Sequence, residues 1–334
     1  MKITFSRTAL PRRGVVVAGV LADKKLTPSA QELDKRTRGR LRQAINASRF
    51  KGEKDQTLTV LTPAGTNLER IVLIGLGKGK DIDSLGLQNA GGSIYAAAAH
   101  VGSGSAFVAV DDIEGCKIDA AEQAAEMAFG ARLRSYRFDK YRTKEKKSDK
   151  PSLSALKFSC AGPNKAKEAF EIRDKIADGV FFTRDLVSEP ANILYPESFA
   201  AEAKKLTKLG VKVEVLGEAQ MRKLGMGALL GVAQGSVREP KLIVMQWNGL
   251  GGSGKKKGGG NKPLAFVGKG VCFDTGGISL KPSGGMEDMK WDMGGAGVVV
   301  GLMKALAGRK AKVNVVGVAG MVENMPDGNA QRPG

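Results

Sequence analysis

The stretch VGKGVCFDTGGISLKPSGGMEDMKWDMGGAG, residues 267–297, carries the most information in this 334-residue chain. It follows an apolar run and sets Lys269, Asp274, Lys281 and Asp292 among many glycines. Aspartate oxygens are good ligands for divalent metal ions. A lysine amine can also donate a lone pair when it is neutral, and burial or an adjacent dication lowers the pKa of a lysine. The spacing therefore fits a metal site.

The same spacing also fits a segment that binds no metal. Asp292 precedes the start of a helix expected at 294–307, where an aspartate can serve as the N-cap. The lysines would then be solvated surface charges. Gly276 and Gly277 let the backbone turn tightly after Asp274 in either case. The residue spacing alone leaves the two interpretations nearly even.

The composition predicts an α/β fold with two domains. The chain is 42% hydrophobic but only 5% aromatic, and it contains 45 glycines, a mix typical of helices packed closely on sheets. Alternating strand-like and helix-like segments predict largely parallel sheets, with ligands at the carboxyl ends of the strands. We expect a smaller N-terminal α/β domain at 1–150 and a linker with a connecting helix at 151–188. Residues 189–334 should form a C-terminal domain with a mostly parallel sheet flanked by helices.

Local patterns predict the individual elements. In the first half, strands are expected at 15–19, 58–61, 70–75, 106–110 and 156–160, and helices at 29–48, 84–101 and 119–136. In the second half, helices are expected at 164–187, 196–209, 218–224 and 294–307, and strands at 211–216, 228–232, 242–247, 264–267 and 313–318. With a strand ending at residue 267, Lys269 would lie just beyond a carboxyl end.

Several chemistries are excluded by residue counts. The only histidine is His100, so a two-histidine zinc motif is impossible, and no G-x-S-x-G elbow accompanies it. Cys116, Cys160 and Cys272 form no C-x-x-C pair, which is typical of reduced intracellular thiols. The N-terminus lacks a signal-peptide core, and no apolar run is long enough for a membrane span. We expect a cytoplasmic enzyme without a membrane partner.

The net charge of +19 suggests one alternative function. Segment 132–150 holds nine basic residues against three acidic ones, with Tyr136 and Tyr141 between them. This pattern fits a nucleic-acid surface, but a solvated helix end that runs into a linker is the favoured interpretation. The sequence signal for a dinucleotide-binding turn after strand 70–75 is weaker still, because Lys80 replaces the third glycine of the fingerprint.

The opening stretch closely resembles the signature region of the leucyl aminopeptidase (cytosol aminopeptidase) family of two-metal peptidases. The resemblance extends to SEPANILYPESF at 188–199 and to VENMPDGNAQRPG at 322–334. It is specific over 186–334 and weak over the first 150 residues. It implies a macro-like N-terminal domain and a C-terminal catalytic peptidase domain.

The resemblance also implies roles for individual residues. The lysine of the family's VGKG motif is a metal ligand, matched here by Lys269. The aspartate of FD[ST]GG bridges both metals and is matched by Asp274, and the aspartate of MK[WY]DM is matched by Asp292, a ligand of the looser metal. The catalytic lysine of ISLKP is matched by Lys281. Met289 would line the pocket for the first side chain of the substrate.

The implied activity is metal-dependent release of leucine and other apolar N-terminal residues from peptides. The resemblance implies two divalent ions, zinc with manganese or magnesium at the exchangeable position, and a homo-hexamer. A further family motif, N-T-D-A-E-G-R, supplies more metal ligands and an arginine that positions a bicarbonate base. It does not occur before Gly334, so we expect a truncated chain that is inactive by itself. The alternative is a non-catalytic, basic nucleic-acid-binding protein on the same fold.

Overall fold

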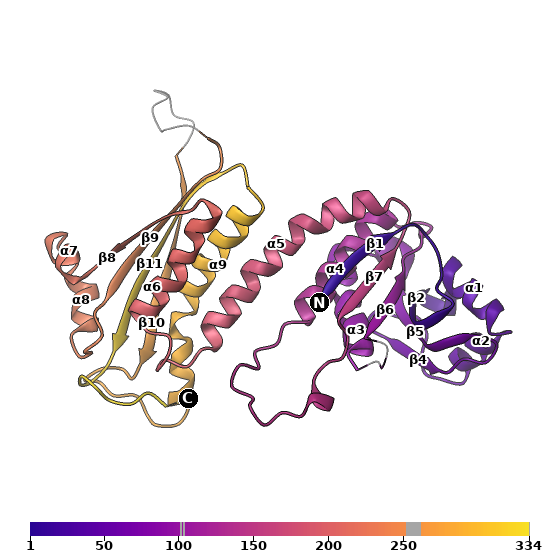
Figure 1. Ribbon diagram of the computed structural model, residues 1–334, viewed down its shortest axis with the longest axis horizontal. Coiled ribbons are helices and arrows are strands. Elements are labelled where there is room, and N and C mark those ends of the chain that lie inside the picture. The colour runs from indigo at the N-terminus through magenta and orange to yellow at the C-terminus, as the bar shows by residue number, and fades with distance from the viewer. Residues whose placement is uncertain (101, 103, 252–261, 334) are drawn as a thin grey trace. The chain divides into compact units, whose positions relative to one another are not determined.

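The chain folds into two compact units, Met1–Asp174 and Lys175–Gly334, each with its own sheet and hydrophobic core (Figure 1). This is the α/β class with two domains that the composition predicts. Among the described helices, none is long and apolar enough to cross a membrane. The computed structural model describes residues 1–100, 102, 104–251 and 262–333.

The first unit contains one sheet, with the strand order β1-β7-β6-β2-β5-β4 and with β3 paired to β2. Neighbouring strands run parallel except where β4 joins β5 and β3 joins β2. The strands are β1 (Lys2–Ser6), β2 (Arg13–Leu21), β3 (Lys25–Leu26), β4 (Thr57–Leu61), β5 (Asn67–Gly77), β6 (Ser105–Ala109) and β7 (Ala155–Ser159). The helices are α1 (Pro28–Arg36), α2 (Arg40–Asn46), α3 (Ser84–Ala98) and α4 (Ala120–Arg134).

Several elements of the first unit differ from the sequence prediction. The helix expected at 29–48 is divided into α1 and α2, because Arg38 and Gly39 adopt left-handed φ values of 54° and 80°. Strand β1 was not predicted, although its register beside β7 makes it part of the parallel sheet. The helix expected at 84–101 ends at Ala98, and Val101 lies outside the described residues.

The basic segment 132–150 is partly neutralised within the first unit. Arg132 Nε lies 3.1 Å from a carboxylate oxygen of Asp174. Arg137 pairs with both Asp139 and Glu145, the former at 3.2 Å. These ion pairs are what a charged helix end and linker would make. A nucleic-acid role for the segment stays a prediction.

The second unit contains a mixed sheet with the strand order β10-β11-β9-β8. Its strands are β8 (Lys212–Leu216), β9 (Lys241–Asn248), β10 (Leu264–Asp274) and β11 (Asn314–Asn324). Its α-helices are the C-terminal part of α5 (Pro163–Ser188), α6 (Pro196–Lys204), α7 (Glu218–Lys223), α8 (Gly227–Ala233) and α9 (Gly294–Gly308). The 3-10 segments η4 (Lys205–Leu209) and η5 (Met286–Met293) follow α6 and precede α9.

The second sheet is less parallel than the sequence predicts. Among its described strands, β10 and β11 run parallel, whereas β9 is antiparallel to both β11 and β8. Alternation of strands and helices does not fix strand direction when the helices are short. The connection that contains α7 and α8 brings the chain from β8 into β9 in the antiparallel direction.

Two further predictions in this unit are wrong. Residues 228–232, expected as a strand, belong to helix α8, because a short apolar run does not reveal its period. The strand expected at 264–267 continues to Asp274, through the buried backbone of Gly268 and Gly270. Lys269 therefore lies inside β10, and Asp274 occupies its carboxyl end.

Helices cover both faces of the second sheet. Helices α6 and α9 pack on one face, where Phe199, Met303 and Met321 belong to a single buried cluster (Figure 1). Helix α8 packs on the other face through Leu229 and Ala233, which belong to a smaller cluster with Val271 and Val322. β10 is an edge strand of the described sheet. This arrangement holds the ends of β10 and β11 between helical layers.

The three cysteines should differ sharply in reactivity, because the thiolate is the reactive form. Burial, helped by nearby carboxylates, raises the pKa of Cys160 to about 11, and burial also raises the pKa of Cys272. Cys116 is only partly buried.

We expect a disulfide reagent at pH 8 to modify Cys116 rapidly in the native protein and all three thiols in denaturant. A Cys116→Ser variant should lose the rapid phase, and rapid native reaction of a second thiol would contradict this assignment.

Candidate metal centre

The candidate site lies where β10 and β11 end side by side. Asp274 and Asn324 are register partners at the carboxyl ends of these parallel strands. The register shifts between Val271 and Asp274, so β10 is irregular just before the site. Ligand sites in open α/β sheets gather at such carboxyl ends. Asp274, rather than the expected Lys269, occupies the carboxyl end of β10.

The turn after Asp274 is fastened to the end of β11. Thr275 donates to the Asn324 carbonyl through its backbone N–H at 3.0 Å and through its hydroxyl at 2.7 Å. The Lys281 N–H closes the turn onto the Thr275 carbonyl at 2.8 Å. Gly277 has a φ of 68°, and a Cβ atom there would lie 2.5 Å from the side-chain oxygen of Asn324. Glycine is therefore required for this close approach.

The four charged residues predicted from the sequence assemble into two ion pairs. Lys281 Nζ lies 2.7 Å from Asp274 Oδ2, and Lys269 Nζ lies 2.8 Å from Asp292 Oδ1. Asp292 belongs to η5, which leads directly into α9. Asp292 is among the groups that lower the pKa of Asp274, so the two ion pairs lie close to each other. A single cluster thus joins a strand, a turn and a helix start.

Close backbone packing brings Asp292 to Lys269. A Cβ atom on Gly268 would lie only 2.5 Å from the carbonyl oxygen of Gly295, in the first turn of α9. The start of α9 therefore packs directly on β10. Asp292 does not act as the helix N-cap, which is Met293. Its carboxylate is directed to the lysine instead.

The Asp274 carboxylate is held in its charged form. Burial alone would raise its pKa, but hydrogen bonds from Lys281, Gly276 and Asn324 favour the anion. Together with the interaction with Asp292, they lower the pKa of Asp274 to about 2. The group is consequently ionised across the neutral range, as a metal ligand must be.

The residues present fit a divalent cation. Asp292 Oδ2 is buried and has no hydrogen-bond partner in the part of the chain that the structure describes. A buried carboxylate oxygen without a partner is costly unless it receives a proton donor or a cation. The described residues contain no group of three or more His, Cys, Asp or Glu side chains placed to hold a metal. The donor set is thus two aspartates and a lysine amine, and the oxygen ligands suit hard divalent ions.

Met289 lies beside the lysine that the resemblance marks as catalytic. Its Sδ atom is 3.1 Å from Lys281 Nζ. The Met289 side chain packs on a small apolar cluster that contains the buried residues Phe273 and Met325. An apolar surface therefore adjoins the charged cluster, where the sequence resemblance predicts a side-chain pocket.

Two domain models of one family match the chain. The model described as the cytosol aminopeptidase family, N-terminal domain, matches residues 16–145, and the catalytic-domain model of the same family matches residues 181–334. The chain belongs to the cytosol aminopeptidase family. The resemblance inferred from the sequence is thereby confirmed.

Individual relatives in the family are close in sequence. A probable cytosol aminopeptidase of Caulobacter vibrioides is 52% identical, over 100% of this chain and 66% of that protein. A second, from a Chelativorans species, is 50% identical over 99% of this chain and 65% of that protein. The chain thus spans about two thirds of the length of the curated relatives that it matches.

Solved structures show the same fold. A mutant of tomato leucine aminopeptidase matches with a TM-score of 0.80 and 29% identity, over 100% of this chain and 65% of that one. The bottromycin maturation enzyme BotP, in complex with Mn, matches with a TM-score of 0.72 and 27% identity, over 95% of this chain and 61% of that one.

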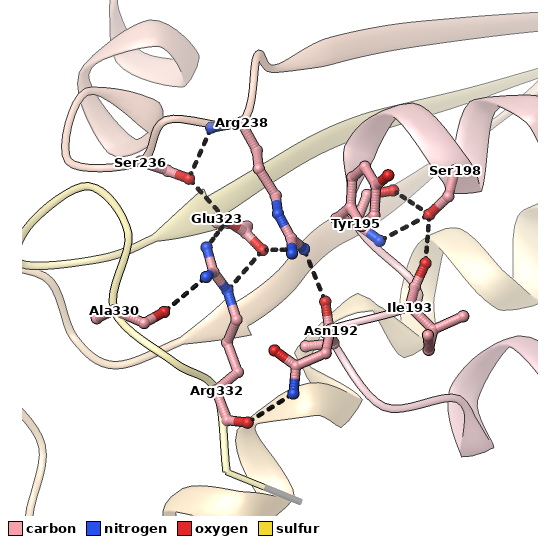
Figure 2. A network of polar contacts seen from close by, with 10 residues as sticks. Asn192, Ile193, Tyr195, Ser198, Ser236, Arg238, Glu323, Ala330 and Arg332 are labelled. Carbon is pink, nitrogen blue, oxygen red and sulfur yellow. Dashed lines mark hydrogen bonds and ion pairs between the residues drawn. The ribbon is translucent and has the colours of Figure 1, made fainter.

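The sequence analysis missed a buried polar network around Glu323, the residue of β11 that precedes Asn324 (Figure 2). Glu323 is completely buried, and its carboxylate accepts hydrogen bonds from Arg238 at 3.2 Å and from Ser236 at 2.7 Å. Arg332, itself 3% exposed, donates to both carboxylate oxygens. Two arginines therefore balance one buried acid.

The same network fastens two loops to the sheet. Arg238 also donates to the Ala191 carbonyl at 2.8 Å, and its guanidinium lies 3.9 Å from the ring centroid of Tyr195. The Asn192 amide donates to the Arg332 carbonyl at 2.8 Å. The loop between α5 and α6 and the segment after β11 are thus tied together, as Figure 2 shows. An acid at the end of an apolar strand is the sequence signal that could have revealed this network.

Loss of the buried charge should destabilise the second unit strongly. Glu323→Gln keeps the side-chain shape but leaves two arginines without their anion, and breaking a buried pair costs about 3–5 kcal/mol. We expect this loss in the free energy of unfolding measured by urea denaturation. Glu218→Gln, which disrupts an exposed pair with Arg222, is the matched control and should cost less than about 1 kcal/mol. Equal effects of the two variants would contradict the role of the network.

Proposed function

We propose that this protein is a metal-dependent aminopeptidase that releases leucine and other apolar residues from the N-termini of peptides. The observation that carries the proposal is the cluster of Lys269, Asp274, Lys281 and Asp292, in which Asp274 stands at the carboxyl end of β10 beside the parallel strand β11. Membership of the cytosol aminopeptidase family supports it. The named activity of the close relatives supports the same reaction class.

Lys269, Asp274 and Asp292 would hold the divalent ions. Zinc, manganese and magnesium are the candidates, and the presence of Mn in the related BotP structure supports manganese. When bound, such ions generate a hydroxide nucleophile from water at neutral pH and polarise the scissile carbonyl. Lys269 donates a hydrogen bond to Asp292, so it must lose that proton before its amine can coordinate a metal. The buried, unpartnered oxygen of Asp292 is available as a ligand.

Lys281 would supply the positive charge for the transition state. Its ammonium is held by Asp274, and its side chain remains 37% exposed to solvent, so a substrate can reach it. As the scissile carbonyl oxygen becomes negative, the ammonium can donate a hydrogen bond to it. Preorganised donors of this kind stabilise tetrahedral intermediates.

Substrate preference would follow from the apolar surface beside Lys281. Met289 places its thioether against the lysine and packs on the buried Phe273 and Met325 of the same cluster. A flexible methionine adapts to apolar side chains of different shapes. Leucine and similar first residues should therefore bind better than charged ones.

The wider biological setting is part of the same proposal. We infer a cytoplasmic homo-hexamer that acts on peptides and uses bicarbonate as a base. The name of the relatives as cytosol aminopeptidases supports the location. Light scattering on the full-length gene product should give six times the subunit mass, and a monomer would reject the assembly.

The activity should depend on divalent ions. We expect the full-length gene product to release p-nitroaniline from leucine p-nitroanilide, to lose this activity after chelation, and to regain it with Mn²⁺. Acetylated leucine p-nitroanilide is the matched control substrate, because it lacks a free α-amine. Undiminished turnover in the presence of excess chelator would reject the proposed mechanism.

Loss of the Lys281 charge should impair turnover more than folding. Removing one donor to a developing oxyanion costs roughly 10²–10³-fold in kcat. We expect a fall of this size for Lys281→Met on the leucine substrate. The control is Lys312→Met, an exposed lysine just before β11, which should leave kcat unchanged. A Lys281→Met enzyme with near wild-type kcat would remove this residue from the mechanism.

A further inference from the structure

Asn324, at the end of β11, is bonded to the charged cluster through both its side chain and its backbone. Its side-chain amide donates to Asp274 Oδ1 at 2.7 Å. Its backbone carbonyl accepts both hydrogen bonds from Thr275. Its side-chain oxygen lies so close to Gly277 that any larger residue at that position would collide with it. None of the roles assigned above belongs to this residue.

The hydrogen bond from Asn324 decides how the Asp274 carboxylate is oriented. The terminal torsion of an aspartate is broad, so external contacts must fix the plane of the carboxylate. Oδ1 receives Asn324 Nδ2 and Gly276 N, whereas Oδ2 receives Lys281 Nζ. Without the amide, Oδ1 would keep only the Gly276 N–H at 2.9 Å. With one donor left on each oxygen, Gly276 N–H on Oδ1 and Lys281 on Oδ2, the carboxylate plane would be less restrained than with three donors.

Asn324 is itself held in place from the opposite side of the strand. Successive side chains of a strand point to opposite faces, so Glu323 and Asn324 diverge. Glu323 is clamped by Arg238 and Arg332 in the buried network of Figure 2. The strand end is thus anchored on one face and presents its amide to Asp274 on the other.

We propose that Asn324 is a positioning residue, whose amide holds the Asp274 carboxylate in the orientation that a bound divalent metal requires. Glu323 supports it by fixing the end of β11. The inference rests on the proposed function, because it takes Asp274 as a metal ligand. Residues that orient metal ligands typically contribute 10- to 100-fold to metal affinity or activity.

The test compares Asn324→Leu with Asn314→Leu in the full chain. Both replace an asparagine of β11 with an apolar residue of similar size. Asn314 lies at the opposite end of the strand, where its side chain accepts a hydrogen bond from Leu250 N. Calorimetric titration with Mn²⁺ should show an affinity at least about tenfold weaker for Asn324→Leu. Asn314→Leu should bind like the wild-type chain.

A second readout separates positioning from stability. In metal-free buffer, the melting temperatures of the two variants should agree closely. A crystal structure of the metal-free Asn324→Leu chain should show the plane of the Asp274 carboxylate rotated from its wild-type orientation. If this variant fails to fold, Asn324→Ala is measured in the same two ways, because its cavity can admit water.

The outcomes distinguish this inference from the proposed function. An Asn324 variant that binds Mn²⁺ less than tenfold more weakly than wild type, or that keeps the Asp274 orientation, overturns the positioning role alone. A wild-type chain that binds no Mn²⁺ overturns the metal centre and this inference with it. Weakened binding together with a turned carboxylate supports the proposal.

Discussion

The completely buried carboxylate of Glu323 imposes the strongest electrostatic constraint on the second unit. An ionised acid without solvent is costly unless positive partners and hydrogen bonds surround it. Arg238 and Arg332 meet that requirement, and each also bonds to a backbone carbonyl in a loop beside the sheet. The end of β11 and its flanking segments therefore have one arrangement in which every charge is satisfied.

The candidate site depends on the position of Glu323, because Asn324, the next residue of β11, contacts Asp274 in the site. Asn324 contacts Asp274, Asp274 contacts Lys281, and the turn between these two closes on the Asn324 carbonyl. Charges alternate through the cluster, so each lysine neutralises one carboxylate. The two lysines of the cluster are partly exposed, and one oxygen of Asp292 is buried without a hydrogen-bond partner among the described residues.

The sequence predicted much of this architecture, and its failures have identifiable causes. Long elements with clear periods, such as α5 and α9, were placed to within a residue or two. Helix α8 was mistaken for a strand because seven residues do not display a helical period. The antiparallel course of β9 was missed because strand direction depends on connections in space, which local patterns do not encode.

By itself the sequence determined the α/β class, the family, and the residue types that could hold a metal, because these depend on composition and on the spacing of a conspicuous motif. Only the tertiary structure decided which lysine faces which aspartate, since that depends on the contact between α9 and β10. It also revealed Glu323 and Asn324, whose hydrogen-bond partners lie as many as 87 positions away in the chain, as Ser236 does from Glu323. Hydrogen bonds between such distant residues form only when packing brings strand ends and loops together.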